Sequence, residues 1–156
     1  MGKKIHLLAK KSNLLDIRIK VGSELVRFNL FEELAINPTK INEELQNQPT
    51  HFAYLSVVMI QLKKKKDTLE AELQKLRDSI FIEYKEDIDP QTGRAYSNDL
   101  AEAYISQDEE YQEKLKEYKA AEDNYLLIKA AVDSFSQRSE VIRSLSANVR
   151  QEKSIN

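Results

Sequence analysis

Apolar residues in the second two-thirds of the chain recur with the seven-residue period of packed helices. Two adjoining rows carry the pattern: Leu55, Leu62, Leu69 and Leu76, and beside them Met59, Leu73 and Ile80. Beyond residue 50 the only proline and the only glycine are Pro90 and Gly93. Because these two residue types weaken helices most, the pattern predicts long helical stretches over 50–86 and 97–152, joined by 87–94.

The second stretch shows its own start signals. Ser97 is a suitable cap for a short helix over 99–105, and Ser106-Gln107-Asp108-Glu109 is a capping-box pattern that predicts a new helix from Gln107. Two apolar rows follow: Tyr111, Tyr118, Tyr125 and Val132, then Ala121, Ile128, Phe135, Ile142 and Val149. Two matching seams with a short connection predict an antiparallel, coiled-coil-like helical hairpin.

The N-terminal part has a different period. Apolar and polar residues alternate over 16–21 and again over 26–30, on either side of Gly22-Ser23. Alternation around a two-residue turn predicts a β-hairpin within 15–30, whereas Leu7-Leu8 and Phe31–Leu34 leave short helices over 5–36 as the alternative.

A cap and a proline mark the end of this N-terminal part. Asn37-Pro38 predicts a short helix over 38–46, and Gln48-Pro49-Thr50 predicts its end. We therefore expect a basic N-terminal segment, 1–48, and a long helical hairpin, 49–156.

Composition favours an elongated α-protein that assembles with itself. The 156 residues are 41% apolar and 32% charged, so the core is expected to be a seam that is completed by homo-oligomerisation. The absence of cysteine excludes disulfides and thiolate metal sites. No apolar run approaches about 18 residues, so we expect a soluble, cytoplasmic protein without a membrane partner.

Charge is distributed unevenly although the net charge is only −2. Residues 1–27 hold seven basic and two acidic groups, residues 61–85 seven and five, and residues 86–124 four and twelve. One face of the molecule is therefore expected to attract phosphate, while another repels phosphate or recruits a basic partner.

The chain shows no catalytic constellation. His6 and His51 lie in different segments, and neither has a serine or carboxylate at a useful spacing. The loop 87–93 resembles a calcium loop only superficially, because no bidentate glutamate follows it, and no glycine-rich phosphate loop occurs. We expect neither an enzyme nor a cofactor or metal.

Four consecutive lysines, Lys63 to Lys66, have two interpretations. They point around the helix about 100° apart. They are either a solvated face with partners such as Lys66–Glu70 and Lys65–Glu72, or part of a strip that tracks phosphates, with Lys75 and Arg77 further along. The tyrosines of the last helix are expected in the seam, whereas Phe52 and Tyr54 suit either the core or base stacking.

The C-terminal helix resembles that of the UvsY family of phage recombination mediators. The resemblance is carried by the segment from Tyr125 through Arg138 and Ile142-Arg143 to Leu145. Two shorter motifs earlier in the chain add to it, Asn42–Pro49 and Glu117–Glu122. It covers about 40–150, with a helix ending in a basic stretch, a polar loop and a tyrosine-containing helix in the same order. Residues 1–36 have no clear counterpart.

The resemblance implies a homo-oligomer, with a ring as the expected form, that binds single-stranded DNA without sequence preference. Such mediators help a RecA-like recombinase displace single-strand-binding protein. The family's basic motif falls on Lys75 and Arg77, and with the lysine strip the expected DNA-binding residues are Lys63, Lys64, Lys66, Lys75 and Arg77. The expected oligomerisation residues are Phe135, Ile142, Leu145 and Val149.

A rival interpretation comes from a different class of protein. A β-hairpin attached to long antiparallel helices also suits a structural or chaperone-like coiled-coil oligomer, either a prefoldin-like clamp or a phage scaffold component. In that case the lysines serve solubility and the chain binds no nucleic acid.

Overall fold

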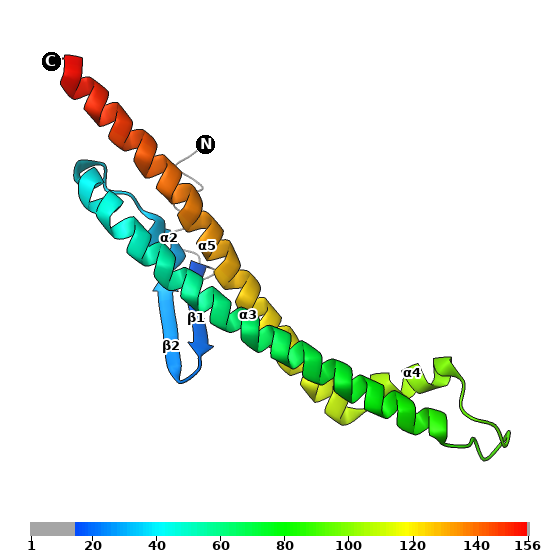
Figure 1. Ribbon diagram of the computed structural model, residues 1–156. Coiled ribbons are helices and arrows are strands. Elements are labelled where there is room, and N and C mark those ends of the chain that lie inside the picture. Colours follow the sequence, from blue (N-terminus) through cyan, green and yellow to red (C-terminus); the bar gives the residue numbers. More distant parts are fainter. Residues whose placement is uncertain (1–14, 156) are drawn as a thin grey trace. The chain divides into compact units, whose positions relative to one another are not determined.

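The computed structural model describes residues 15–155, with side chains to residue 151, and it is mainly helical (Figure 1). His6 and the basic residues that precede residue 15 lie outside the described residues. The elements, in chain order, are strands β1 (Asp16–Val21) and β2 (Glu24–Asn29), helix α2 (Leu30–Leu34), the 3-10 turn η2 (Pro38–Lys40), and helices α3 (Ile41–Glu86), α4 (Asn98–Gln107) and α5 (Glu109–Ile155).

The predicted β-hairpin is confirmed over 16–29. Its strands are antiparallel with Ile17 opposite Phe28 and Ile19 opposite Val26, and a two-residue turn joins them. Gly22 has a φ of 61°, and Ser23, like every other described residue that is not glycine, has no positive φ, as in a type II′ turn with glycine first. Ile17 and Ile19 are each 1% exposed, so this face of the hairpin is buried within a single chain.

The predicted helix break at Pro49 is wrong. Asn37 caps only the short turn η2, its side chain accepting from the Thr39 amide, and α3 then runs without interruption through Pro49. The residue before the proline is held by tertiary contact: Gln48 is 4% exposed, and its side-chain amide donates to the Phe135 carbonyl at 2.7 Å. This anchoring overrides the local preference of a pre-proline residue for extended backbone. The boundary expected at 48/49 therefore falls inside a helix.

The connection between α3 and α4 is an ordered turn where the gap was predicted. The Asp89 carboxylate accepts from the Gln91 amide at 2.8 Å and from the Thr92 hydroxyl at 2.9 Å, and these bonds lower the pKa of Asp89. Gly93, at a φ of 65°, donates its amide to the Asp89 carbonyl and closes the turn.

Start signals beyond this turn are partly confirmed. Ser97 caps α4, its hydroxyl accepting from the Leu100 amide, as predicted. A new helix does begin near residue 107, but Asp108 rather than Ser106 is its cap: the Asp108 carboxylate accepts from the Tyr111 amide at 2.8 Å. A carboxylate at this position also interacts favourably with the positive end of the helix dipole.

Internal contacts divide the chain into two compact units. The first consists of the residues before 62 and after 125, and the second of 62–125. The buried apolar core of the first unit includes Ile17, Ile19, Leu55, Ile128, Phe135 and Ile142, and that of the second Leu62, Ile80, Ala101, Ile105 and Ala121. Other seam residues, among them Leu69, Leu73 and Leu76, are half-buried.

Within each unit, α3 and α5 run antiparallel. In the first unit Glu44 bonds to Arg138 and Gln48 to Phe135. In the second, Lys66 lies over the Tyr118 ring and Glu72 pairs with Lys114. Residue numbers rise along one helix as they fall along the other, as the two matching seams predicted.

Candidate nucleic-acid interface

All five predicted DNA-binding residues lie on α3 within the second unit, and the structure separates them into two groups. Lys63, Lys64 and Lys75 are exposed, and none forms an ion pair with a described residue. Lys65, between them, is also exposed and unpaired within the described chain. These lysines keep their full charge available to an anion.

Lys66 belongs to the other group. Its amine pairs with Glu70 at 2.9 Å and with Asp67 at 3.1 Å, and its side chain is only 17% exposed. It also lies 5.9 Å from the centre of the Tyr118 ring, a cation–π distance. The hydrogen bond to Glu70, followed by that to Asp67, raises the pKa of Lys66. The positive charge of Lys66 is therefore balanced by neighbouring carboxylates within the helical seam.

The positive charge of Arg77 is balanced by carboxylates as well. Its guanidinium bonds to Glu102 of α4 and lies 3.8 Å from Asp78. A second ion pair between elements joins Lys114 of α5 to Glu72 of α3 at 2.9 Å, and this bond raises the pKa of Lys114. These pairs tie helices of the second unit together rather than presenting charge to a ligand.

The two ion pairs expected for a solvated lysine face have different outcomes. The Lys66–Glu70 pair is confirmed at one helical turn. The Lys65–Glu72 pair is wrong, because Glu72 accepts from Lys114 instead. Spacing along one helix cannot reveal that a cation on another helix is the nearer partner.

An open depression on α3 contains two of the exposed lysines. Lys64 and Lys75 line it together with Thr68 and Ala71, and Asp67 and Glu72 are also part of its wall. Eleven residues separate the two lysines, which is about three helical turns or 16 Å, so they lie on one face. Lys63 and Lys65 are exposed about 100° to either side of Lys64 and border this face. The depression and these two lysines form the candidate interface, called the lysine strip below.

The tyrosines of the second unit serve packing. Tyr111 and Tyr118 are half-buried, as the seam predicts. A cluster that the sequence pattern did not reveal joins Tyr84, Tyr96 and Tyr104: the rings of Tyr84 and Tyr104 stack at 4.2 Å with an interplanar angle of 4°. Burial is the largest cause that raises the pKa of Tyr96 in this cluster.

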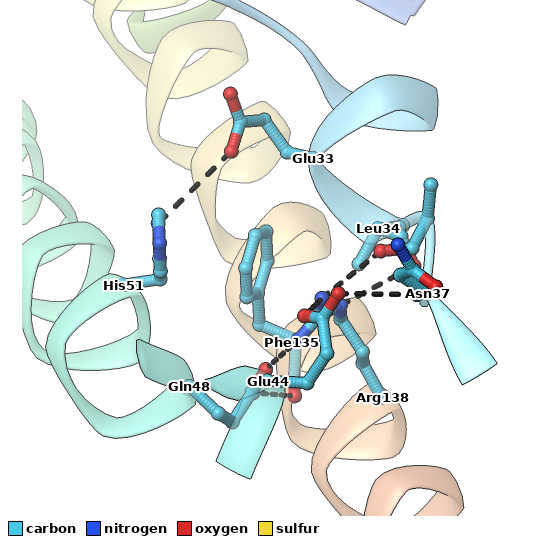
Figure 2. Close-up of polar contacts among 9 residues, drawn as sticks. Glu33, Leu34, Asn37, Glu44, Gln48, His51, Phe135 and Arg138 are labelled. Carbon is cyan, nitrogen blue, oxygen red and sulfur yellow. Dashed lines mark hydrogen bonds and ion pairs between the residues drawn. The ribbon is translucent and has the colours of Figure 1, made fainter. Parts of the chain in front are cut away.

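The first unit contains a buried polar network centred on Arg138 (Figure 2). The Arg138 guanidinium is 8% exposed and donates to the backbone carbonyls of Leu34 and Ala35 and to the side chains of Glu44 and Gln48. No buried side-chain nitrogen or oxygen in the described chain lacks a partner. Because each of its three side-chain nitrogens already donates to the protein, this arginine anchors the segment after α2 to α3, and it is not available to a ligand.

The predicted oligomerisation residues are divided by burial. Phe135 and Ile142 are 2% and 0% exposed within a single chain, so their side chains already pack in the core of the first unit. Leu145 is half-buried and Val149 is 37% exposed. Val149 lines a surface pocket of about 670 Å³ with Ile41 and Leu45. Of the four predicted residues, Leu145 and Val149 are therefore the two that keep side-chain surface for a contact with a second copy.

His51 contacts two side chains of the first unit. His51 Nδ1 lies 4.0 Å from the Glu33 carboxylate, and the His51 ring stacks on Phe135 with centroids 6.2 Å apart. Among the described residues no group of three or more histidines and carboxylates is placed to hold a metal ion. None of the helices in the described part combines the length and apolar character that crossing a bilayer requires.

Comparison with known proteins finds no relative: no family model, no curated protein and no solved structure matches this chain.

Proposed function

We propose that this chain binds single-stranded nucleic acid without sequence preference, as a homo-oligomer, and acts as a recombination mediator. One observation carries the proposal. In the second unit Lys66, Arg77 and Lys114 are matched by carboxylates, whereas Lys63, Lys64, Lys65 and Lys75 remain exposed and unpaired among the described residues. A fold that neutralises some cations and leaves four neighbours free suits a polyanionic ligand.

Oligomerisation would give these weak contacts their effect. Each exposed lysine contributes little affinity to a phosphate by itself, but copies of the strip held in one assembly would bind one strand at a high effective concentration. The first unit exposes large apolar side chains that suit such an assembly, among them Val57 and Ile60 on α3 and Leu126 and Val141 on α5.

The binding proposal is tested by fluorescence anisotropy with oligo-dT at several salt concentrations. In the variant Lys63→Gln/Lys64→Gln/Lys75→Gln, affinity is expected to fall, and the slope of log K against log salt is expected to decrease by about 2, at about 0.7 for each lost contact to single-stranded nucleic acid. Arg77 is left intact because its loss would break the pair with Glu102.

A matched control separates a site from bulk charge. The variant Lys116→Gln/Lys119→Gln/Lys129→Gln removes the same charge from exposed lysines of α5 that form no ion pair with described residues. It is expected to bind nearly as well as the unmodified chain. Equal losses in the two variants would argue against the lysine strip, and an unchanged affinity in the first variant would remove it as the site.

The mediator role is supported by the resemblance to the UvsY family, and it needs a separate test. The chain is added to oligo-dT that carries single-strand-binding protein, and the DNA-dependent ATPase rate of a RecA-like recombinase is measured. We expect the chain to restore the rate and the strip variant to restore it less. If the chain binds oligo-dT yet leaves the rate unchanged, single-strand binding stands and the mediator role does not.

A structural or chaperone-like coiled coil is the second candidate. The exposed apolar residues of the first unit favour it, because such surfaces also suit client proteins or scaffold contacts. This candidate predicts no binding of oligo-dT even at low salt, together with suppressed aggregation of an unfolded client, measured by light scattering.

A further inference from the structure

The outward face of the β-hairpin, in the first unit, is positively charged. The strand register places Arg18 directly opposite Arg27. Side chains alternate along a strand, so Lys20 lies on the same face as Arg18, while Ile17 and Ile19 lie on the buried face. All three basic side chains are exposed.

No hairpin cation forms an ion pair with a described residue, although Asp16 lies on the same face and leaves it a net charge of two positive groups. The ion pairs of the first unit are Lys40–Glu43, His51–Glu33 and Arg138–Glu44, and none involves a hairpin cation. The nearest acidic residue in the strand pattern, Asp16, accepts from the Asn29 side chain at 2.6 Å. Like charges directly opposite each other destabilise a strand pair. The arrangement therefore costs stability unless an anion binds it.

A pocket of about 290 Å³ lies beside the same strand. Its wall includes Arg27 and Phe28 of β2, His51 and Tyr54 of α3, and Phe135 of α5. Glu33, which lies 4.0 Å from His51, is also part of this wall. His51 and Tyr54 are three residues apart, which is about one helical turn, so both rings border the pocket. Tyr54 is 54% exposed and the His51 side chain 52%, so both rings are open to a ligand. Arg27 therefore joins the two features, because it belongs to the charged outward face of the hairpin and also borders the pocket with the exposed rings.

We propose that the hairpin face and this pocket form a second contact for single-stranded nucleic acid. Phosphates lie against Arg18, Lys20 and Arg27, and a base stacks on the ring of Tyr54 beside His51. Proteins that bind single strands without sequence preference combine these two elements, a basic track and aromatic rings. The inference rests on the proposed nucleic-acid binding, but it uses residues of the other unit and none of the lysine strip.

The free edge of β2 admits a different occupant, an added strand from a protein. Backbone pairing would suit that edge, but it would leave the opposed arginines without counter-charge. Charge complementarity therefore favours the polyanion.

Stacking is tested with a single fluorophore, because the chain contains no tryptophan. In the variant Tyr54→Trp, oligo-dT is expected to quench the fluorescence over the same concentration range in which anisotropy rises. Phe52→Trp is the matched control: Phe52 is 38% exposed on the same helix but lines a different pocket, with Gln48 and Pro49. Its fluorescence is expected to change little.

The charged face is tested with Arg18→Gln/Arg27→Gln. Affinity for oligo-dT is expected to fall, and the salt slope by about 1.4, at about 0.7 for each lost contact. The thermal unfolding midpoint is expected to stay or rise, because the like-charge pair is gone. Lys129→Gln/Arg143→Gln removes the same charge from exposed α5 positions and is expected to bind nearly unchanged.

The outcomes distinguish the two proposals. If the unmodified chain fails to bind oligo-dT at low salt, both are overturned. If it binds, and the strip variant weakens binding while the arginine variant and the Tyr54→Trp signal are unaffected, only the second contact is overturned. A Tyr54→Trp signal that follows protein concentration but not oligo-dT would instead assign this face to contacts between copies, and it too would overturn the inference.

Discussion

Arg138 is the residue with the most buried polar contacts in the first unit. It bonds to Glu44, whose carboxylate also accepts from the Asn37 amide at 3.1 Å. That amide bond is the largest cause that lowers the pKa of Glu44, and Arg138 acts in the same direction against the opposing effect of burial. The Glu44 side chain is 20% exposed, so the pair is well shielded from water.

Removing the Glu44 charge should destabilise the chain. In Glu44→Gln the buried guanidinium of Arg138 loses its counter-charge, and we expect a loss of about 3 kcal/mol in the free energy of unfolding. The neighbouring Glu43→Gln is the matched control, because its pair with Lys40 is exposed at both ends, and it should cost no more than about 0.5 kcal/mol. Urea unfolding followed by circular dichroism measures both. Equal effects would contradict the shielded role of Glu44.

The same carboxylate predicts a pH dependence. Since folding lowers the pKa of Glu44, its contribution is fully present above the pKa of the unfolded chain. It is lost as the pH falls through the lower pKa of the folded chain. The thermal unfolding midpoint should therefore decrease on acidification below about pH 5 more steeply in the unmodified chain than in Glu44→Gln. Parallel curves for the two proteins would exclude Glu44 as a source of this dependence.

At the scale of elements, α3 is the clearest case in which tertiary contacts overrule a local signal. Proline has no amide hydrogen, so Pro49 cannot donate to the Leu45 carbonyl, and its ring crowds the preceding turn. The helix nevertheless continues, with Gln48 bonded to Phe135 one residue earlier. Pro49 therefore lowers the free energy of unfolding without interrupting the helix.

Replacing this proline should stabilise the chain. Pro49→Ala restores the amide donor within a continuous helix, and after allowing for the greater freedom of the unfolded chain we expect a gain of about 1 to 2 kcal/mol. Denaturant unfolding measures it. Pro90→Ala, in the turn between α3 and α4, is the control and should give no such gain. An unchanged stability of Pro49→Ala would contradict the continuous helix, because a helix interrupted at residues 48–50 has no place for the restored amide hydrogen bond.

At the scale of the whole molecule, several large apolar side chains remain exposed in a single chain. On α5 of the first unit Leu127 and Val141 are 40% and 49% exposed, and they belong to a row without a charged residue, Leu127, Ala130, Ser134, Gln137, Val141 and Ser144. A heptad-like row without charges is typical of a helix that packs against another helix. This row, rather than the buried Phe135 and Ile142, suits a second copy.

We therefore expect a native mass above that of one chain, reduced by Leu127→Lys/Val141→Lys. A charge at these positions would have to be desolvated in a packed interface, whereas it costs little on an exposed helix of a single chain. Sedimentation velocity measures the mass, and circular dichroism checks that the helices remain. Ser136→Lys, at an exposed position outside this row, is the control and should keep the native mass. A single-chain mass for the unmodified protein at micromolar concentration would contradict the assembly.

Local patterns determined much of this protein. The seven-residue period, the position of Pro90 and Gly93, and the alternation around Gly22-Ser23 were enough to predict most of the long helices, the turn between them and the hairpin, but not that α3 begins at Ile41 and continues through Pro49. These features depend on backbone preferences and on repeating burial, both of which are written into a few neighbouring residues.

Only the tertiary structure decided which polar residues are already satisfied. Lys66 stands on the seven-residue row of Met59 and Leu73, so the pattern places it in the seam, but only the fold brings it beside Tyr118 of α5. Arg77 meets Glu102, and Arg138 meets Glu44, across 25 and 94 residues of chain. The strand register likewise set Arg18 against Arg27. Pairing energies depend on distance in space, which spacing along the chain does not reveal once the partners lie on different elements.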